Sequence, residues 1–117
     1  NLPIKIFVIN NKGYGLIKQT QDTWLDSRRV GVDSRSGLAM PNLIKIANAY
    51  GIKTVEINNH KEMDKKLRGV LKSKFPVLCD VKVDEKQKVI PKLEFGREIQ
   101  DLSPRLNQEE MNLNMIK

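Results

Sequence analysis

The sequence predicts an α/β domain of three layers, in which helices cover both faces of a mainly parallel sheet. Residues 4–9 form an almost uninterrupted apolar run, which is typical of a strand buried on both faces. Strand-like runs follow at 52–57 and 77–83. Helical periodicity occupies 41–50 and 59–74, between these runs. This alternation of strands and helices is typical of a right-handed parallel sheet.

The bulk composition is that of one soluble domain. The chain has 117 residues, of which 39% are hydrophobic, and no apolar run reaches the about 18 residues of a membrane span. Because the N-terminus lacks the features of a secretory signal, we expect a cytoplasmic protein without a membrane partner. The one cysteine, Cys79, cannot form an internal disulfide, and its place in an apolar run predicts a buried position.

The formal net charge of +7 is compatible with a nucleic acid, a membrane surface or an anionic cofactor as partner. Aromatic residues make up only 5% of the chain and the basic residues are scattered, so we expect no nucleic-acid partner. The basic residues of 61–74 are interpreted as the solvated face of a helix, and His60 as a surface or capping residue.

The first half of the chain reads in order as strand, helix and loop. A chain that opens directly on a two-sided buried strand leads us to expect further sequence upstream. Residues 16–24 are expected to form a short helix, and Trp24 to pack in the core or against a loop. Residues 25–40 lack periodicity, and an irregular segment of this length predicts an ordered loop near a site.

The next helix is predicted to begin at Pro41 and to end at Gly51, which favours a left-handed conformation. Its predicted inward face consists of Leu43, Ile46, Ala47 and Tyr50. In the strand that follows, Val55 and Ile57 are expected to point inward.

A third helix is predicted to open on a capping box formed by Asn59 and Glu62 and to end at Phe75-Pro76. Its predicted inward face consists of Met63, Leu67, Val70 and Leu71. From Asp84 onward apolar residues become sparse, so we expect a domain over 1–83 and an arm over 84–117, with a short helix near 109–113.

The loop after the first strand has the chemistry of a metal and phosphate site. The side-chain oxygen of Asn11 and the backbone carbonyl of Gly13 are suitable ligands for magnesium. Gly15 and the residues after it would present backbone N–H groups at a helix start, where a phosphate is favoured. The same residues also form an ordinary turn, so local chemistry leaves both interpretations open.

A family resemblance favours the first interpretation. Residues 1–15, NLPIKIFVINNKGYG, resemble the second half of the thiamine-diphosphate motif of the acetolactate synthase-like family, in which a Gly-Asp-Gly lies upstream of an Asn-Asn pair. Residues 40–43 and 49–51 resemble the next helix of that family and its end. Residues 75–78 resemble the strand that closes the cofactor domain, and 101–104 the C-terminal arm.

The resemblance implies a thiamine-diphosphate-binding fold, present as a fragment, and a role for each loop residue. Asn11 and Gly13 would bind Mg²⁺, while Tyr14, Gly15 and Leu16 would approach the diphosphate. Leu16 and Ile17 would pack against coenzyme and substrate. The aspartate of Gly-Asp-Gly is absent from this chain, and the activating glutamate comes from a partner subunit in the family, so the fragment is expected to be inactive.

The implied parent protein is a homodimeric or homotetrameric 2-oxo acid decarboxylase or carboligase that acts on a substrate such as pyruvate. The resemblance is also compatible with a bound FAD in the parent protein. Residues 18–21 lack the tryptophan usual in acetolactate synthases, which favours a different acceptor substrate. Two other classes stay open. One is a non-catalytic, doubly wound α/β binding module with a basic surface, and the other is a flavodoxin-like domain with unrelated ligand use.

Overall fold

The computed structural model describes residues 2–115 of the chain. It divides into two compact units, Asn1–Gln87 and Lys88–Lys117. Residue 1, where the expected domain begins, and residues 116–117, where the expected arm ends, lie outside the described residues. The expected boundary between domain and arm, after residue 83, stays a prediction.

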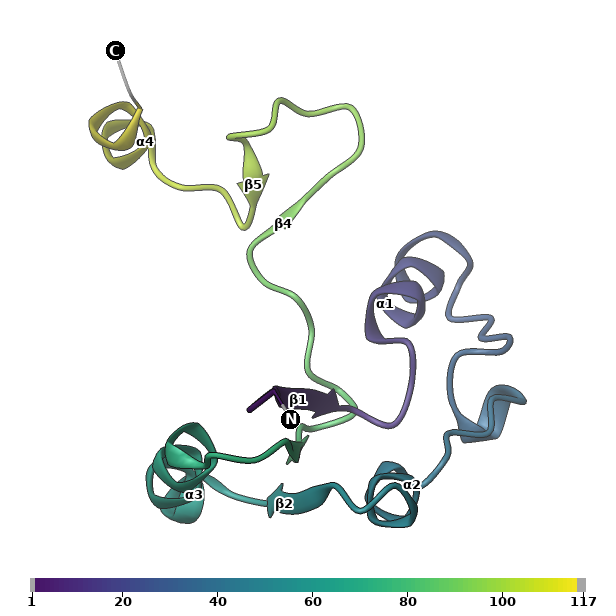
Figure 1. Cartoon of the computed structure of the whole chain (residues 1–117). Coiled ribbons are helices and arrows are strands. Elements are labelled where there is room, and N and C mark those ends of the chain that lie inside the picture. The colour runs from purple at the N-terminus through teal and green to yellow at the C-terminus, as the bar shows by residue number, and fades with distance from the viewer. Residues whose placement is uncertain (1, 116–117) are drawn as a thin grey trace. The chain divides into compact units, whose positions relative to one another are not determined.

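The first unit is built on a parallel sheet of three strands (Figure 1). The strands are β1 (Lys5–Asn10), β2 (Lys53–Ile57) and β3 (Val77–Lys82). β3 lies in the middle and pairs in parallel with both neighbours, so that Val8 and Glu56 flank Asp80. The three strands therefore end at the same edge of the sheet, and the predicted parallel sheet is confirmed.

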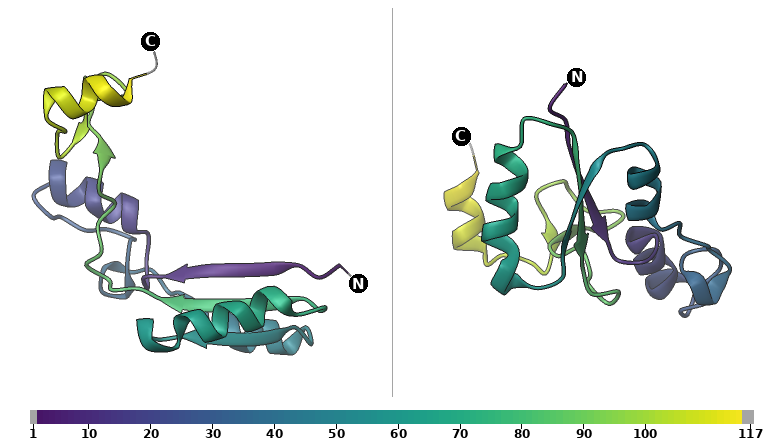
Figure 2. Two further views of the ribbon diagram at one scale, coloured as in Figure 1. Left: turned by 90° about the vertical axis from the view of Figure 1, so that its left-hand side faces the viewer. Right: turned by 60° about the horizontal axis from the view of Figure 1, so that its bottom comes forward.

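Helices lie against both faces of the part of this sheet that β2 and β3 form. α2 (Leu43–Ala49) contacts β2 and β3, whereas α3 (His60–Lys72) contacts β2 and lies on the opposite side (Figure 2). The chain crosses from β1 outward to β2 and then returns inward to β3. Two right-handed crossovers that run in opposite directions place their helices on opposite faces. The predicted three-layer α/β arrangement is confirmed.

The core lies between α3 and the sheet. Ile57, Val70, Val77 and Cys79 are buried there, with Val55, Met63, Leu67 and Val81 packed around them. Burial raises the pKa of the Cys79 thiol, because the thiolate form would lose its hydration. The predictions of a buried Cys79 and of inward-facing Val55 and Ile57 are confirmed.

The predicted start and inward face of α2 are partly wrong. The helix begins at Leu43, and Asn42 caps it by accepting a hydrogen bond from the N–H of Lys45 at 3.0 Å. Pro41 lies before the cap. Ala47 is buried, but Ile46 and Tyr50 are exposed, because the short helix turns Leu43 and Ala47 toward the sheet and ends before Tyr50.

The predicted face of α3 is wrong at one position. Leu71 is exposed, since it follows the buried Val70 by about 100° around the helix and so leaves the inward stripe. Asn59 caps the helix by accepting a hydrogen bond from the N–H of Glu62, whose carboxylate accepts one from the N–H of Asn58. The capping pair is thus present, with its return bond one residue earlier than predicted.

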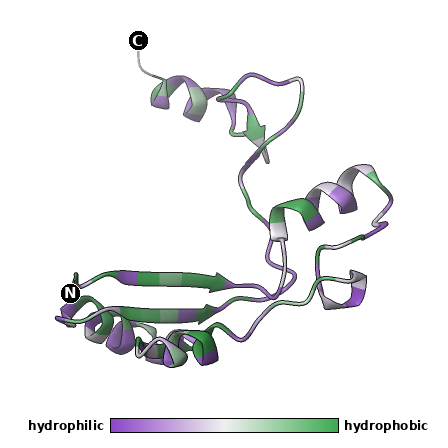
Figure 3. Cartoon of the chain, turned by 45° about the vertical axis from the view of Figure 1, so that its right-hand side comes forward, coloured by the Kyte–Doolittle hydropathy of each residue, from purple (hydrophilic) through white to green (hydrophobic). Residues whose placement is uncertain are grey.

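β1 is not buried on both faces as its sequence predicts. Within residues 2–115 its only strand partner is β3, so it forms an edge of the sheet. Figure 3 shows its length as mostly hydrophobic, and Ile6, Phe7 and Ile9 are all exposed, Ile9 by 64%. The apolar run therefore does form a strand, but residues 2–115 cover neither its second edge nor its two faces.

The second unit holds little regular structure. β4 (Lys92–Leu93) and β5 (Leu102–Ser103) pair antiparallel, and α4 (Gln108–Asn114) follows. Asn107 caps α4 by accepting a hydrogen bond from the N–H of Glu110 at 2.7 Å. The short helix predicted near the C-terminus is confirmed. No helix within the described residues is long and apolar enough to cross a membrane.

Truncating the core should destabilise the protein far more than the same change on the surface. Ile57→Ala removes a side chain that is 2% exposed and should lower the free energy of unfolding by about 2–5 kcal/mol. Ile46→Ala, at a residue 43% exposed, is the matched control and should cost less than about 1 kcal/mol. Urea denaturation followed by circular dichroism measures both, and equal losses would contradict the assigned core.

Candidate functional site

The candidate site lies beyond the carboxyl ends of the strands, where ligands bind in open parallel sheets. β1 runs into the turn of residues 11–14, which leads to α1 (Gly15–Trp24), and the loop of 25–40 contains a short 3₁₀ helix, η1 (Ser34–Ser36). Figure 3 shows these segments beyond the strand ends. The loop of 25–40 is ordered, as predicted, and its expected place near a functional site stays a prediction.

Two asparagine side chains shape the turn. The N–H of Lys12 donates to Asn10 Oδ1 and the N–H of Gly13 donates to Asn11 Oδ1, both at 3.2 Å. Lys12 has a φ of 58°, a left-handed conformation that costs a residue with a Cβ about 1 kcal/mol or more. Local carboxamide bonds of this kind stabilise such conformations. The two asparagines therefore hold the turn in an otherwise unfavoured shape.

Gly13 is required because the loop of 25–40 passes against it. Gly13 and Asp33 form an isolated antiparallel bridge, and the N–H of Tyr14 donates to the carbonyl of Val32 at 2.9 Å. A Cβ on Gly13 would lie 2.3 Å from that carbonyl oxygen. Only glycine lets the two backbone segments come this close.

Gly15 starts α1 against the side chain of Asn11. A Cβ on Gly15 would lie 2.5 Å from Asn11 Nδ2, so any larger residue would displace the amide. Tyr14, at the N-cap, gives α1 no side-chain cap. The N–H groups at the N-terminus of α1 therefore have no side-chain cap. They point out of this end of the helix, where an anion is favoured.

The first turn of α1 also presents apolar side chains outward. Leu16 is 64% exposed and Ile17 is 53% exposed, so both are accessible to a bound molecule. Trp24, at the other end of α1, is 62% exposed, so it does not pack in the core, and its expected packing against a loop stays a prediction. Its position at the last residue of a helix that turns another face, including Lys18, inward explains the difference.

A buried carboxylate anchors the loop of 25–40, and sequence reasoning missed it. Asp33 Oδ1 accepts from both the N–H and the hydroxyl of Ser36, while Lys18, Arg29 and Arg35 lie within 3.6–4.0 Å of Oδ2. The bonds from Ser36 and the nearby cations lower the pKa of Asp33. The sequence signal was the Asp-x-x-Ser pattern of 33–36, a capping box read only as a loop.

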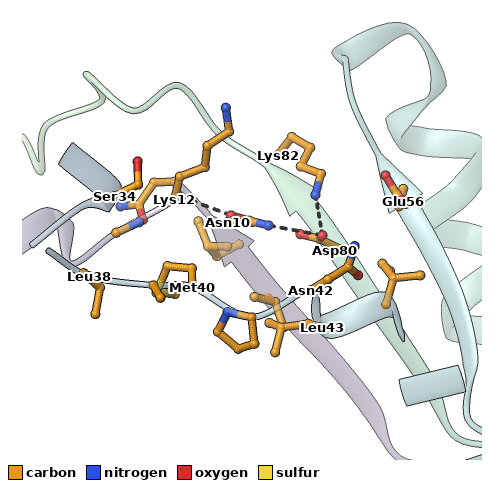
Figure 4. Close-up of a pocket in the computed structure, with 17 residues that line it drawn as sticks. Asn10, Lys12, Ser34, Leu38, Met40, Asn42, Leu43, Glu56, Asp80 and Lys82 are labelled. Carbon is orange, nitrogen blue, oxygen red and sulfur yellow. Dashed lines mark hydrogen bonds and ion pairs between the residues drawn. The ribbon is translucent and has the colours of Figure 1, made fainter. Parts of the chain in front are cut away.

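A pocket of about 580 Å³ opens next to the turn (Figure 4). Its lining includes Asn10, Lys12, Glu56, Asp80 and Lys82, together with apolar residues of 38–44. Asp80 is 2% exposed and was also missed from the sequence. The available signal was a single acidic residue in the middle of the apolar run of 77–83.

The loop could supply part of a cation site. Asn11 Oδ1 accepts one hydrogen bond, which leaves a second lone pair for a hard cation. No group of three or more His, Cys, Asp and Glu side chains among residues 2–115 could hold a metal by itself. A cation at this turn would therefore need further oxygen ligands from outside it.

Comparison with known proteins identifies close relatives. The profile of the family described as "Thiamine pyrophosphate enzyme, C-terminal TPP binding domain" matches residues 1–81. The chain is 36% identical over 96 residues to the acetolactate synthase large subunit of Porphyra purpurea, covering 82% of this chain and 16% of that protein. It is 34% identical over 94 residues to the mitochondrial acetolactate synthase catalytic subunit of Saccharomyces cerevisiae, covering 80% and 13%.

The large subunit of Buchnera aphidicola subsp. Schlechtendalia chinensis is 38% identical over 93 residues, covering 77% of this chain and 16% of that protein. The chain thus spans about one sixth of the length of the curated relatives that it matches.

The Asp33 network should respond to acid. Because folding lowers the pKa of Asp33, its carboxylate contributes its full stabilisation above the ordinary carboxyl pKa, about 4. This stabilisation is lost as the pH falls through the lower pKa that Asp33 has in the folded state. The only tryptophan, Trp24, adjoins the loop, so its fluorescence should change below about pH 4. Asp33→Asn should remove this transition, whereas Asp64→Asn, at an exposed site on α3, should keep it. An unaltered titration in Asp33→Asn would refute the anchoring role.

Proposed function

The chain belongs to the thiamine pyrophosphate enzymes, as their C-terminal TPP binding domain, and from this membership we propose that its strand-end turn binds the magnesium diphosphate of thiamine diphosphate. The single observation that carries the proposal is the juxtaposition of Asn11, Gly13 and Gly15 in one turn, at the carboxyl end of β1. An amide oxygen, a backbone carbonyl and an uncapped helix start are the groups that a metal diphosphate needs.

In this proposal, Asn11 Oδ1 and the carbonyl of Gly13 are ligands of Mg²⁺. The bond from the N–H of Gly13 fixes the Asn11 amide without using its last lone pair. Because Mg²⁺ takes a near-octahedral set of oxygen ligands, the remaining ones come from the diphosphate, water and a residue outside the turn. The aspartate of an upstream Gly-Asp-Gly is the candidate for that residue.

The diphosphate would meet the start of α1. Tyr14, Gly15 and Leu16 supply the backbone at this point, and their N–H groups together with the helix dipole favour negative charge. Leu16 and Ile17 extend from the same turn and would pack against the coenzyme and substrate, which explains why two apolar side chains stand exposed there.

The parent protein is proposed to be a 2-oxo acid decarboxylase or carboligase that uses a substrate such as pyruvate, since its relatives are named acetolactate synthases. Thiamine diphosphate supplies the carbanion chemistry when bound, and the protein orients the reactants. A homodimer or homotetramer and a bound FAD belong to the same proposal. The cytoplasmic location stays a prediction, and some relatives are named mitochondrial.

One observation supports the alternative of a binding module with a basic surface. Four exposed basic residues recur along α3 at helical spacing, which places them on one stripe: Lys61, Lys65, Arg68 and Lys72. Asp64 lies beside them and reduces the local charge. Tight retention on DNA that weakens steeply with salt would favour this alternative, because such binding depends on phosphate contacts. Coenzyme binding that depends on Asn11 would favour the first proposal.

Removing the Asn11 amide should weaken coenzyme binding. Asn11→Ala in the full-length parent protein should raise the Kd for thiamine diphosphate in the presence of Mg²⁺ by about tenfold or more, because one oxygen ligand is lost. Gly15→Ala should act in the same direction by displacing the amide. The controls are Asn112→Ala on the exposed part of α4 and Gly69→Ala, whose added Cβ meets nothing within 4 Å. Calorimetric titration measures all four, and coenzyme affinity that is indifferent to Asn11 would sink the proposal.

The 117-residue chain should show no turnover by itself. Residues 11–14 include no Asp or Glu that could bind the metal, and the activating glutamate is expected from a partner subunit. Purified chain incubated with pyruvate, Mg²⁺ and thiamine diphosphate should release carbon dioxide no faster than the buffer does, while the full-length parent protein serves as the positive control. Measurable decarboxylation by the chain alone would contradict the expectation that the site also needs an upstream aspartate and a glutamate of a partner subunit.

A further inference from the structure

Asp80 is a buried acid in a place where an apolar residue would cost less. It lies in β3 among Leu78, Cys79 and Val81, and it is 2% exposed. Burying a carboxylate costs hydration free energy that one ion pair repays only in part. Its Oδ1 has no hydrogen-bond partner among the described residues, which adds to the cost. Fold stability alone therefore does not explain an acid at this position.

The bonds of the other carboxylate oxygen lead directly to the strand-end turn. Asp80 Oδ2 accepts from Asn10 Nδ2 at 3.2 Å and from the ammonium group of Lys82 (Figure 4). A carboxylate can only accept, so the Asn10 amide must turn its NH₂ group toward Asp80. Its oxygen then faces the opposite way, where it accepts from the N–H of Lys12 at 3.2 Å. Asp80 on β3 thus orients the Asn10 amide, and the Asn10 amide in turn bonds the backbone of the turn.

We propose that Asp80 is a positioning residue that holds the turn of residues 11–14 in its ligand-binding shape by orienting Asn10. The bond from Asn10 supports the left-handed Lys12, and this conformation places Asn11 and Gly13 next to the start of α1. The role rests on the coenzyme-binding function proposed above. In this proposal Asp80 acts through Asn10 and is not itself a ligand of the metal or the coenzyme. Lys82 compensates the charge of Asp80 through an ion pair, and in the sheet it lies opposite Asn10.

Hydrogen exchange of the coenzyme-free full-length protein tests the positioning role directly. In Asp80→Ala, amides in the peptide of residues 10–15 should exchange about tenfold faster or more, whereas those of α3 should be unchanged. Lys82→Met removes the ion pair but leaves the bond to Asn10, so exchange in the turn should stay near that of the unmodified protein. If Lys82→Met loosens the turn as much as Asp80→Ala does, the ion pair rather than the oriented amide is responsible and the proposal is overturned.

A conservative variant keeps the test valid if Asp80→Ala fails to fold. Asp80→Asn retains an oxygen that can accept from Asn10, so it should restore most of the protection of the turn. Asn10→Ala approaches the same bond from β1 and should loosen the turn by itself. The double variant Asn10→Ala with Asp80→Ala should then be no worse in the turn than Asn10→Ala alone, because both remove one interaction. Additive effects would show that the two residues act independently and would overturn the proposal.

Coenzyme titration separates this proposal from the one on which it rests. Asp80→Ala should raise the Kd for thiamine diphosphate with Mg²⁺ by about 10–100-fold, as is usual for residues that orient metal ligands, and kcat at saturating coenzyme should change much less. Failure of the unmodified parent protein to bind thiamine diphosphate would refute the proposed function while leaving the exchange test of the turn intact. Asn11-dependent binding that is unaffected by Asp80→Ala, with an unchanged turn, would refute the positioning role alone.

Discussion

The two carboxamides that follow β1 are the constraint on which the rest of the candidate site depends. Asn10 and Asn11 each accept a hydrogen bond from an N–H two residues later, and together they keep the backbone in a left-handed conformation at Lys12. This shape turns the chain back under the loop of 25–40 and starts α1 at once. Glycine is then required at positions 13 and 15, because the carbonyl of Val32 and the amide of Asn11 lie too close to leave room for a Cβ.

Two residues with buried acid groups are connected to the turn or to the residue before it. Asp80 contacts it through Asn10 from the middle strand, and Asp33 bridges to Gly13 from the loop of 25–40. Each acid is paired with cations and each keeps one oxygen without a hydrogen bond. Groups of this kind lower the stability of the fold, and their position next to one turn indicates that stability is lost there in exchange for a fixed geometry of the strand end.

The order and type of the strands and helices could be predicted from the sequence because the patterns that specify them are local. Apolar runs, Asn59 at the start of α3 and Gly51 at the end of α2 each act within a few residues, and the alternation of strands and helices then fixes a parallel sheet. Asn11, Gly13 and Gly15 could be selected for the same reason. Asp33, Lys18 and Asp80 could not, because their roles arise from contacts between segments far apart in the chain. The exposed Ile46 and Leu71 were misassigned because periodicity does not say how wide a contact stripe is.

Among residues 2–115, the outer edge of β1 pairs with no other strand, and this has a consequence for the chain as a separate molecule. An exposed, apolar edge strand offers unpaired backbone donors and acceptors to any other strand that approaches, and here Ile6, Phe7 and Ile9 accompany them. Natural edges are usually blunted by charges or bulges, and apart from Lys5 this strand carries no charge. Its sequence suits a position inside a wider sheet, so by itself the chain has the surface of a self-associating, aggregation-prone species.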